Sequence, residues 1–328
     1  MKTLPLAAAV TCLATIAGAE TPVLTVMTYD SFASEWGPGP AIEKGFEATC
    51  GCDLRFVTAG DGAALLARVQ LEGGSSEGDV VVGLDTNLTA AATASGLFAP
   101  HGQPAVTGLP VAWEDAQFLP FDWGWFAFVY DKAKLPNPPA SLEALAASDV
   151  KILIEDPRSS TPGLGLVMWV KAAYGDRAPE IWAALADNIV TVTPGWSEAY
   201  GMFLEGEADM VLSYTTSPAY HLIAEGDDSK AAAPFAEGHY LQVEVAGLLA
   251  GSDQPELGKA FLAYLLGDAA QSVIPTTNWM YPANVPAAGL PEGFGTLIQP
   301  TKSLLFSSDE AGALREAAVA EWQAALSR

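Results

Sequence analysis

The residues best suited to ligand chemistry gather at one junction, the segment VLSYTTSPAY at residues 211–220. An apolar, strand-like run ends there in two aromatic and three hydroxyl side chains: Tyr214, Thr215, Thr216, Ser217 and Tyr220. Ser217 followed by Pro218 is typical of a helix start, with the serine as N-cap and the proline as first helical residue. Ligands of α/β proteins bind at such strand-to-helix junctions, so this segment is a candidate site. An ordinary turn whose tyrosines pack in the core is the alternative.

Other predicted junctions combine a turn with polar or aromatic side chains in the same way. Their candidate ligand contacts are Asp61, Gly62, Ser160, Thr161, Trp196 and Trp279. Asp61 and Thr161 are predicted N-caps and could be nothing more, and Trp196 could belong to the core. Indole and phenol faces attract cations, each desolvated contact contributing about 2 kcal/mol. A helix start at Ser160-Thr161 offers backbone N–H groups to an anion. Together these groups suit a flat ligand with a positive ring and a hydroxyl or phosphate tail, whose charge Asp61 would balance.

Catalytic motifs are not apparent in the sequence. We find no Ser/His/Asp arrangement, nucleophile elbow or phosphate-binding loop. The three histidines, His101, His221 and His239, show no metal-ligand spacing with the cysteines. We therefore expect no catalytic residue, no metal and no cofactor.

The elements that must position these residues alternate between strand and helix, which indicates an α/β fold. Helices are predicted near residues 42–48, 62–71, 87–94, 255–267 and 308–327. Two long strand-like segments, 118–132 and 239–252, are candidate crossovers between two lobes. We predict a first lobe from residues 20–120 with 245–285 and a second from 121–244 with 286–328. A hinge would join the lobes and a ligand cleft would lie between them.

The first nineteen residues are predicted to be a signal peptide. Lys2 precedes an apolar stretch from Leu4 to Ile16, and Ala17-Gly18-Ala19 resembles a cleavage site. The formal net charge of −24 argues against nucleic acid and anionic membrane surfaces as partners. We expect an exported, monomeric protein.

Cys50 and Cys52 are the cysteines that remain after the predicted cleavage, separated by Gly51. An oxidising compartment would allow a small-ring disulfide between them. A reduced pair, or a strained and labile bridge, is the equally weighted alternative.

Long stretches of the chain closely resemble the thiamine-binding periplasmic proteins of bacterial ABC importers. The stretches are TYDSF-x-x-x-WGPGP (28–40), Cys50-Gly51-Cys52, DVVVGLD, PFDWGWFAFVYDK, DPRSSTPGLGL, VTVTPGWSEAYG, LSYTTSPAYH, EGHYLQVEVA and NWMYP. The resemblance implies a two-lobed type II periplasmic binding protein fold. It also implies capture of thiamine, and of its mono- and diphosphate, for delivery to permease subunits in the membrane. It points to Asp61-Gly62, Ser160-Thr161, Trp196 and the segment 214–217 as ligand contacts, with Tyr29, Tyr220 and Trp279 as additions and Trp36 ranked below them.

Two alternatives remain at this point. The same fold class includes ferric-ion and other small-solute binding proteins, and Tyr214 and Tyr220 could in principle ligate iron. A thiaminase I-like enzyme is the other, but its chemistry needs a reactive cysteine nucleophile, and the mature cysteines stand together at Cys50 and Cys52.

Overall fold

The computed structural model describes residues 21–106 and 108–327, so the predicted signal peptide lies outside the described residues. The strands are β1 (Val23–Thr28), β2 (Asp53–Thr58), β3 (Val80–Asp85), β4 (Phe98–Ala99), β5 (Phe118–Asp131), β6 (Ile152–Glu155), β7 (Ile189–Thr193), β8 (Met210–Tyr214), β9 (Lys230–Ala232), β10 (His239–Leu249), β11 (Tyr281–Pro282) and β12 (Ser303–Leu304). The helices are α1 (Asp30–Ala33), α2 (Gly39–Cys50), α3 (Gly62–Glu72), α4 (Thr89–Ser95), α5 (Leu142–Ala146), α6 (Thr161–Tyr174), α7 (Ala178–Leu185), α8 (Trp196–Glu205), α9 (Pro218–Tyr220), α10 (Pro255–Leu265), α11 (Asp268–Gln271), α12 (Ile274–Thr277) and α13 (Ser308–Leu326).

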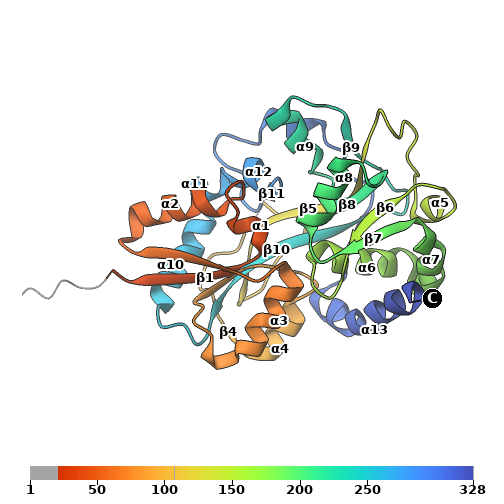
Figure 1. The fold of residues 1–328 in the computed structure, drawn as a ribbon. Coiled ribbons are helices and arrows are strands. Elements are labelled where there is room, and N and C mark those ends of the chain that lie inside the picture. Colours follow the sequence, from red (N-terminus) through yellow and green to blue (C-terminus); the bar gives the residue numbers. More distant parts are fainter. Residues whose placement is uncertain (1–20, 107, 328) are drawn as a thin grey trace, which may run out of the picture.

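The main strands follow the order β2-β1-β3-β10-β5-β8-β6-β7 (Figure 1). β1, β2 and β3 pair in parallel and form what we call the first half of the sheet. β6, β7 and β8 also pair in parallel and form the second half. β10 and β5 lie between the halves and pair antiparallel with each other and with their outer neighbours.

The long strand β5 belongs to both halves. Its first part, Phe118–Trp125, pairs with β10, and its second part, from Phe126 onward, pairs with β8 and β9. The two predicted long strands are therefore present and lie side by side at the centre of the molecule (Figure 1). The lobe boundaries that we drew from the sequence stay a prediction.

The inner strands of the parallel halves are buried because helices cover them, whereas the edge strands β2 and β7 are partly exposed. Every residue of β3 is buried, which explains its run of three valines followed by a leucine two positions later. Most predicted helices agree with the observed ones to within a few residues, although α2 begins earlier, at Gly39. Tyr281 and Pro282 form the short strand β11, which pairs with β5.

One predicted helix cap is wrong by a residue. α6 begins at Thr161, and Ser160 is its N-cap, with its Oγ accepting from the N–H of Gly163. The sequence predicts Thr161 as the cap and Pro162 in the first turn; the proline does lie in the first turn, at the second helical position.

Cys50 and Cys52 form a disulfide in the structure, with a Cα–Cα distance of 5.2 Å. Gly51 between them has φ of +64° and ends α2 in the left-handed conformation, which glycine adopts without steric cost. This pair lies at the end of α2 and contributes no lining residue to the cavity described below. None of the helices in the described ranges is long and apolar enough to cross a membrane.

Candidate functional site

A cavity of about 760 Å³ lies where the carboxyl ends of strands from the two halves face each other. Seven aromatic side chains line it: Tyr29, Trp36, Trp196, Tyr200, Tyr214, Tyr220 and Trp279. Four carboxylates line it as well: Asp30, Asp61, Glu198 and Glu244. Among the described lining residues none is Lys, Arg or His. The side chains of this wall therefore offer aromatic faces and negative charge, which favour a cationic ligand.

Asp61 lies at the point where three helices begin. It is the N-cap of α3, and its Oδ1 accepts from the N–H of Gly62 at 2.7 Å. Its Oδ2 accepts from the Oγ of Ser160 at 2.8 Å, and the backbone N–H groups of Thr161 and Trp196 lie close enough to the carboxylate to lower its pKa. Gly62, Thr161 and Trp196 are the first residues of α3, α6 and α8. The positive ends of three helix dipoles thus converge on one carboxylate, in the way that they would on a bound anion.

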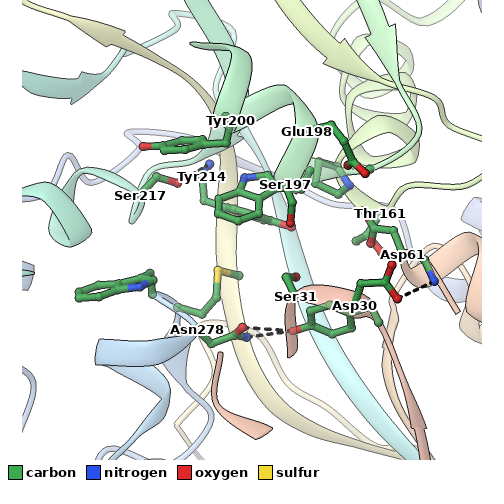
Figure 2. Close-up of a pocket in the computed structure, with 18 of the residues that line it drawn as sticks. Asp30, Ser31, Asp61, Thr161, Ser197, Glu198, Tyr200, Tyr214, Ser217 and Asn278 are labelled. Carbon is green, nitrogen blue, oxygen red and sulfur yellow. Dashed lines mark hydrogen bonds between the residues drawn. The ribbon is translucent and has the colours of Figure 1, made fainter. Parts of the chain in front are cut away.

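This junction joins the two halves of the sheet. α3 packs on the first half, whereas α6 and α8 pack on the second. A backbone bond from Ala64 N to Ser159 O, 3.0 Å long, also connects them. Gly62 is required for the approach, because a Cβ at this position would lie 2.1 Å from Oγ1 of Thr161. Figure 2 shows Asp61 and Thr161 on the same side of the cavity.

The Asp61 carboxyl has its pKa raised by burial, and the hydrogen bonds from the helix starts act against that rise. Glu155, the last residue of β6, receives no such hydrogen bonds. Its side chain is 1% exposed, and neither carboxyl oxygen has a hydrogen-bond partner among the described residues. Burial, and then the nearby charges of Asp61 and Glu198, raise the pKa of Glu155 well above its ordinary value. Burial without a hydrogen-bond partner therefore favours the protonated form of Glu155.

Trp196 is held by its indole nitrogen rather than packed in the core. Its Nε1 donates to Oγ of Ser213 at 2.7 Å, and the ring stacks on Tyr200 with centroids 5.0 Å apart. Ser213 in turn bonds to Oγ of Ser217 at 2.7 Å, and that hydroxyl accepts from the N–H of Tyr214. α9 starts at Pro218 as predicted, but the Ser217 side chain bonds backward to β8 instead of capping the helix.

Tyr220 and Trp279 form an aromatic pair at another part of the wall. Their ring centroids are 5.3 Å apart and their planes meet at 74°. Among the described non-glycine residues, Trp279 alone has a positive φ, 56°. A bulky side chain is rarely found in that conformation, and such strain is characteristic of functional positions.

The floor of the cavity is a hydrogen-bonded group from four elements. The hydroxyl of Tyr29 lies 3.4 Å from Oε2 of Glu244 and 3.1 Å from Nδ2 of Asn278. The same Nδ2 donates to Oδ2 of Asp122 at 2.6 Å. Figure 2 shows Asn278 bonded to the tyrosine hydroxyl. Asp122 and Glu244 face each other directly across β5 and β10.

Behind the aromatic wall, a second chain of hydrogen bonds orients two tyrosines. Tyr200 and Glu225 bond to the two ring nitrogens of His221, at 3.0 and 2.7 Å, and Tyr220 donates to Glu225 at 3.0 Å. His221, Glu225 and Asp227 come close enough to hold a metal ion. Both ring nitrogens are already engaged, however, and Asp227 bonds to Ser229 and Lys230. We interpret the cluster as structural support for the aromatic wall.

Eight of the predicted contacts line the cavity: Tyr29, Asp61, Thr161, Trp196, Tyr214, Ser217, Tyr220 and Trp279. Gly62 and Ser160 lie just behind it and hold Asp61. Thr215 and Thr216 are fully buried and do not line the cavity; Thr216 contacts the sulfur of Met280. The ligand contacts themselves stay predictions.

Sequence reasoning missed several lining residues, of which Gln242 and Glu244 matter most. Both stand in the long apolar strand β10, two positions apart and so on one face. Two polar side chains at that spacing, in a strand otherwise rich in valine and leucine, were the available signal. Trp36, which we ranked low, lies at the cavity with 54% of its surface exposed, its ring 6.2 Å from that of Trp196.

Comparison with known proteins agrees with this geometry. The family model described as bacterial extracellular solute-binding protein matches residues 34–272. The thiamine-binding periplasmic protein of Escherichia coli (strain K12) is 56% identical over 311 residues, which cover 94% of each chain. A solved periplasmic thiamin binding protein has a TM-score of 0.92 and 54% identity, covering 95% of this chain and 98% of that chain.

A more distant structure bears on the iron alternative. Iron-bound HitA from Pseudomonas aeruginosa has a TM-score of 0.75 at 19% identity, covering 93% of this chain and 99% of that one. That identity shows a shared fold alone, so iron binding is not favoured.

The predicted type II periplasmic binding protein fold is confirmed. The high-identity relative is named as a binding protein, which agrees with our expectation of a transport protein rather than an enzyme. The chain belongs to the bacterial extracellular solute-binding proteins and, among them, to the family of thiamine-binding periplasmic proteins.

Proposed function

We propose that this chain is the substrate-binding component of an ABC importer, capturing thiamine and delivering it to the permease subunits. The observation that carries the proposal is the cavity wall of seven aromatic rings and four carboxylates, without a basic side chain among the described lining residues. Thiamine is a flat cation, so aromatic faces and carboxylates are the groups that it should contact. The name of the Escherichia coli relative supports the same ligand.

The ligand would lie across the cavity with its rings near Tyr220 and Trp279. Its hydroxyethyl tail would reach Asp61, where a hydroxyl can donate to the carboxylate. The N–H groups that begin α6 and α8 make the same end suitable for the phosphate of thiamine monophosphate and diphosphate. A phosphate would share those donors with Asp61, and it is the helix starts that would compensate its charge.

We further propose that the protein works in the periplasm as a monomer, after removal of residues 1–19. The relatives are named as periplasmic proteins, which supports this compartment. The predicted signal peptide and the disulfide at Cys50 and Cys52 fit an oxidising compartment as well.

Isothermal titration calorimetry of the mature protein with thiamine and its two phosphates tests the proposal. We expect one ligand per chain and saturable heat for each of the three compounds, and no heat with ferric citrate. Intrinsic tryptophan fluorescence should be quenched in parallel, because Trp196 and Trp279 line the cavity. Absence of both signals with all three compounds would remove thiamine as the ligand.

A further inference from the structure

The Asp122–Glu244 pair on the cavity floor is unusual because both groups are acidic and both are buried. Asp122 is 0% exposed and Glu244 is 5% exposed. The two residues face each other directly in the register of β5 on β10, and two carboxylates held side by side in a buried site cannot both stay ionised without a counter-charge. Oδ1 of Asp122 is buried and has no hydrogen-bond partner among the described residues. Burial raises the pKa of Asp122 to about 7 and that of Glu244 well above its ordinary value.

No described neighbour supplies a positive charge to this pair. The groups that face Glu244 are Tyr29 after β1, Asp85 on β3, Asp122 on β5, Tyr214 on β8 and Asp61 before α3, with Asn278 after α12. Asp85 is itself buried and is bonded to the backbone and side chain of Asn87. In the empty cavity a proton is therefore the counter-charge available to the pair.

Glu244 nevertheless reaches the cavity, whereas Asp122 lies behind it. A positively charged ring above Glu244 would take the place of the missing cation. We propose that the Asp122–Glu244 pair holds one proton while the cavity is empty and releases it to the solvent when a cationic ligand binds. The shared O–H bond breaks, the proton passes to buffer, and the second negative charge on the pair is balanced by the ring. This inference rests on the proposed function and assigns Glu244 as a further ligand-binding group.

The proposal fixes the direction of the pH dependence. A bound cation favours the ionised pair and so lowers its pKa, which means that binding releases a proton near neutral pH. Affinity should rise with pH through that range, by up to about tenfold per pH unit when one full proton is released. Because the two carboxyls titrate together, the effect belongs to the pair.

Calorimetry with thiamine in buffers of equal pH but different ionisation enthalpy counts the protons released. At pH 7 we expect about one proton, or a large fraction of one, for the wild-type protein. Glu244→Gln should reduce the count to near zero, because the amide donates directly to Asp122 and no shared proton is needed. Asp122→Asn should do the same without changing a lining residue. Glu198→Gln removes a carboxylate from the same cavity and should keep the wild-type count.

Each outcome has one meaning. Heat that does not depend on the buffer in the wild-type protein overturns the inference, and so does a proton count unchanged in both Glu244→Gln and Asp122→Asn. Loss of the count in Glu198→Gln also overturns it, because the proton would then not belong to this pair. Thiamine that binds without proton release leaves the proposed function standing, whereas failure of thiamine to bind at all defeats the function itself. Each variant enters the comparison only if its circular dichroism spectrum shows that it is folded.

Discussion

Two regions of one cavity accommodate buried carboxyl groups in different ways. At the junction of three helices, Asp61 accepts hydrogen bonds from the N–H of Gly62 and the hydroxyl of Ser160, and the N–H groups that begin α6 and α8 lie close to it. On the floor, Asp122 and Glu244 face each other on antiparallel strands, where the N–H groups are already paired within the sheet. Helix starts supply free donors and sheet interiors do not, so the first carboxyl can stay charged while the floor pair shares a proton. Burial raises the pKa of all three carboxyls, and the element that carries each group decides how far nearby donors offset that rise.

The largest expected effect comes from removing the helix-bound carboxylate. Asp61→Ala leaves the start of α3 and the Ser160 hydroxyl without their acceptor, and it removes one of the contacts between the two halves. Thiamine affinity should fall on the order of 100-fold, measured by calorimetry. Asp30→Ala is the matched control, because Asp30 is a lining carboxylate that accepts one backbone bond, from Gly60. Equal losses in the two variants would mean that Asp61 acts through its charge alone.

A smaller effect is expected from the aromatic wall, which depends on ring contact rather than on charge. Trp279→Ala removes a ring that contacts Tyr220 and should weaken thiamine binding roughly tenfold. Trp36→Ala should weaken it by less than about threefold, because more than half of Trp36 is exposed to solvent. Fluorescence titration of both variants checks this order. A greater loss of affinity in Trp36→Ala than in Trp279→Ala would place the thiamine rings at the mouth of the cavity, beside Trp36, instead.

Glu155 sharpens the comparison, because it is a buried carboxyl with neither helix donors nor a partner acid. Its folded-state pKa is raised, so its ionised form is favoured in the unfolded chain. Stability is greatest below the unfolded pKa near 4.3 and is lost as pH rises toward the folded value. Glu155→Gln removes this titration and should stabilise the protein by about 1–2 kcal/mol at pH 8 relative to its effect at pH 4.5. Chemical denaturation at the two pH values measures the difference; an effect independent of pH would contradict it.

Local sequence signals predicted the elements well and individual caps less well. Asp61-Gly62 before an apolar helical pattern identified the start of α3, and two long aromatic or valine-rich runs identified β5 and β10. These predictions succeeded because capping and strand periodicity depend on a few neighbouring residues. The prediction of Thr161 as the cap was wrong because Ser160 caps a helix equally well. Pro162 does not decide between them, since proline is accepted at either the first or the second helical position.

The arrangement around each carboxyl could not be predicted in the same way. Ser160 lies 99 residues from Asp61, and its contact depends on how the two halves meet. Asp122 and Glu244 become neighbours only through the register of β5 on β10, which a one-residue shift would abolish. Thr215 and Thr216 show the opposite case: the junction that carries them was predicted correctly, but both side chains are buried and do not line the cavity.

The meeting of three helices on Asp61 has a consequence for how the cavity opens. α3 belongs to one half of the sheet and α6 and α8 to the other, so parting the halves must strip the carboxylate from two helices in a single movement. The cost of opening should accordingly be concentrated in this one small region, and a partner that separates the halves to release the ligand would have to break the contacts made there.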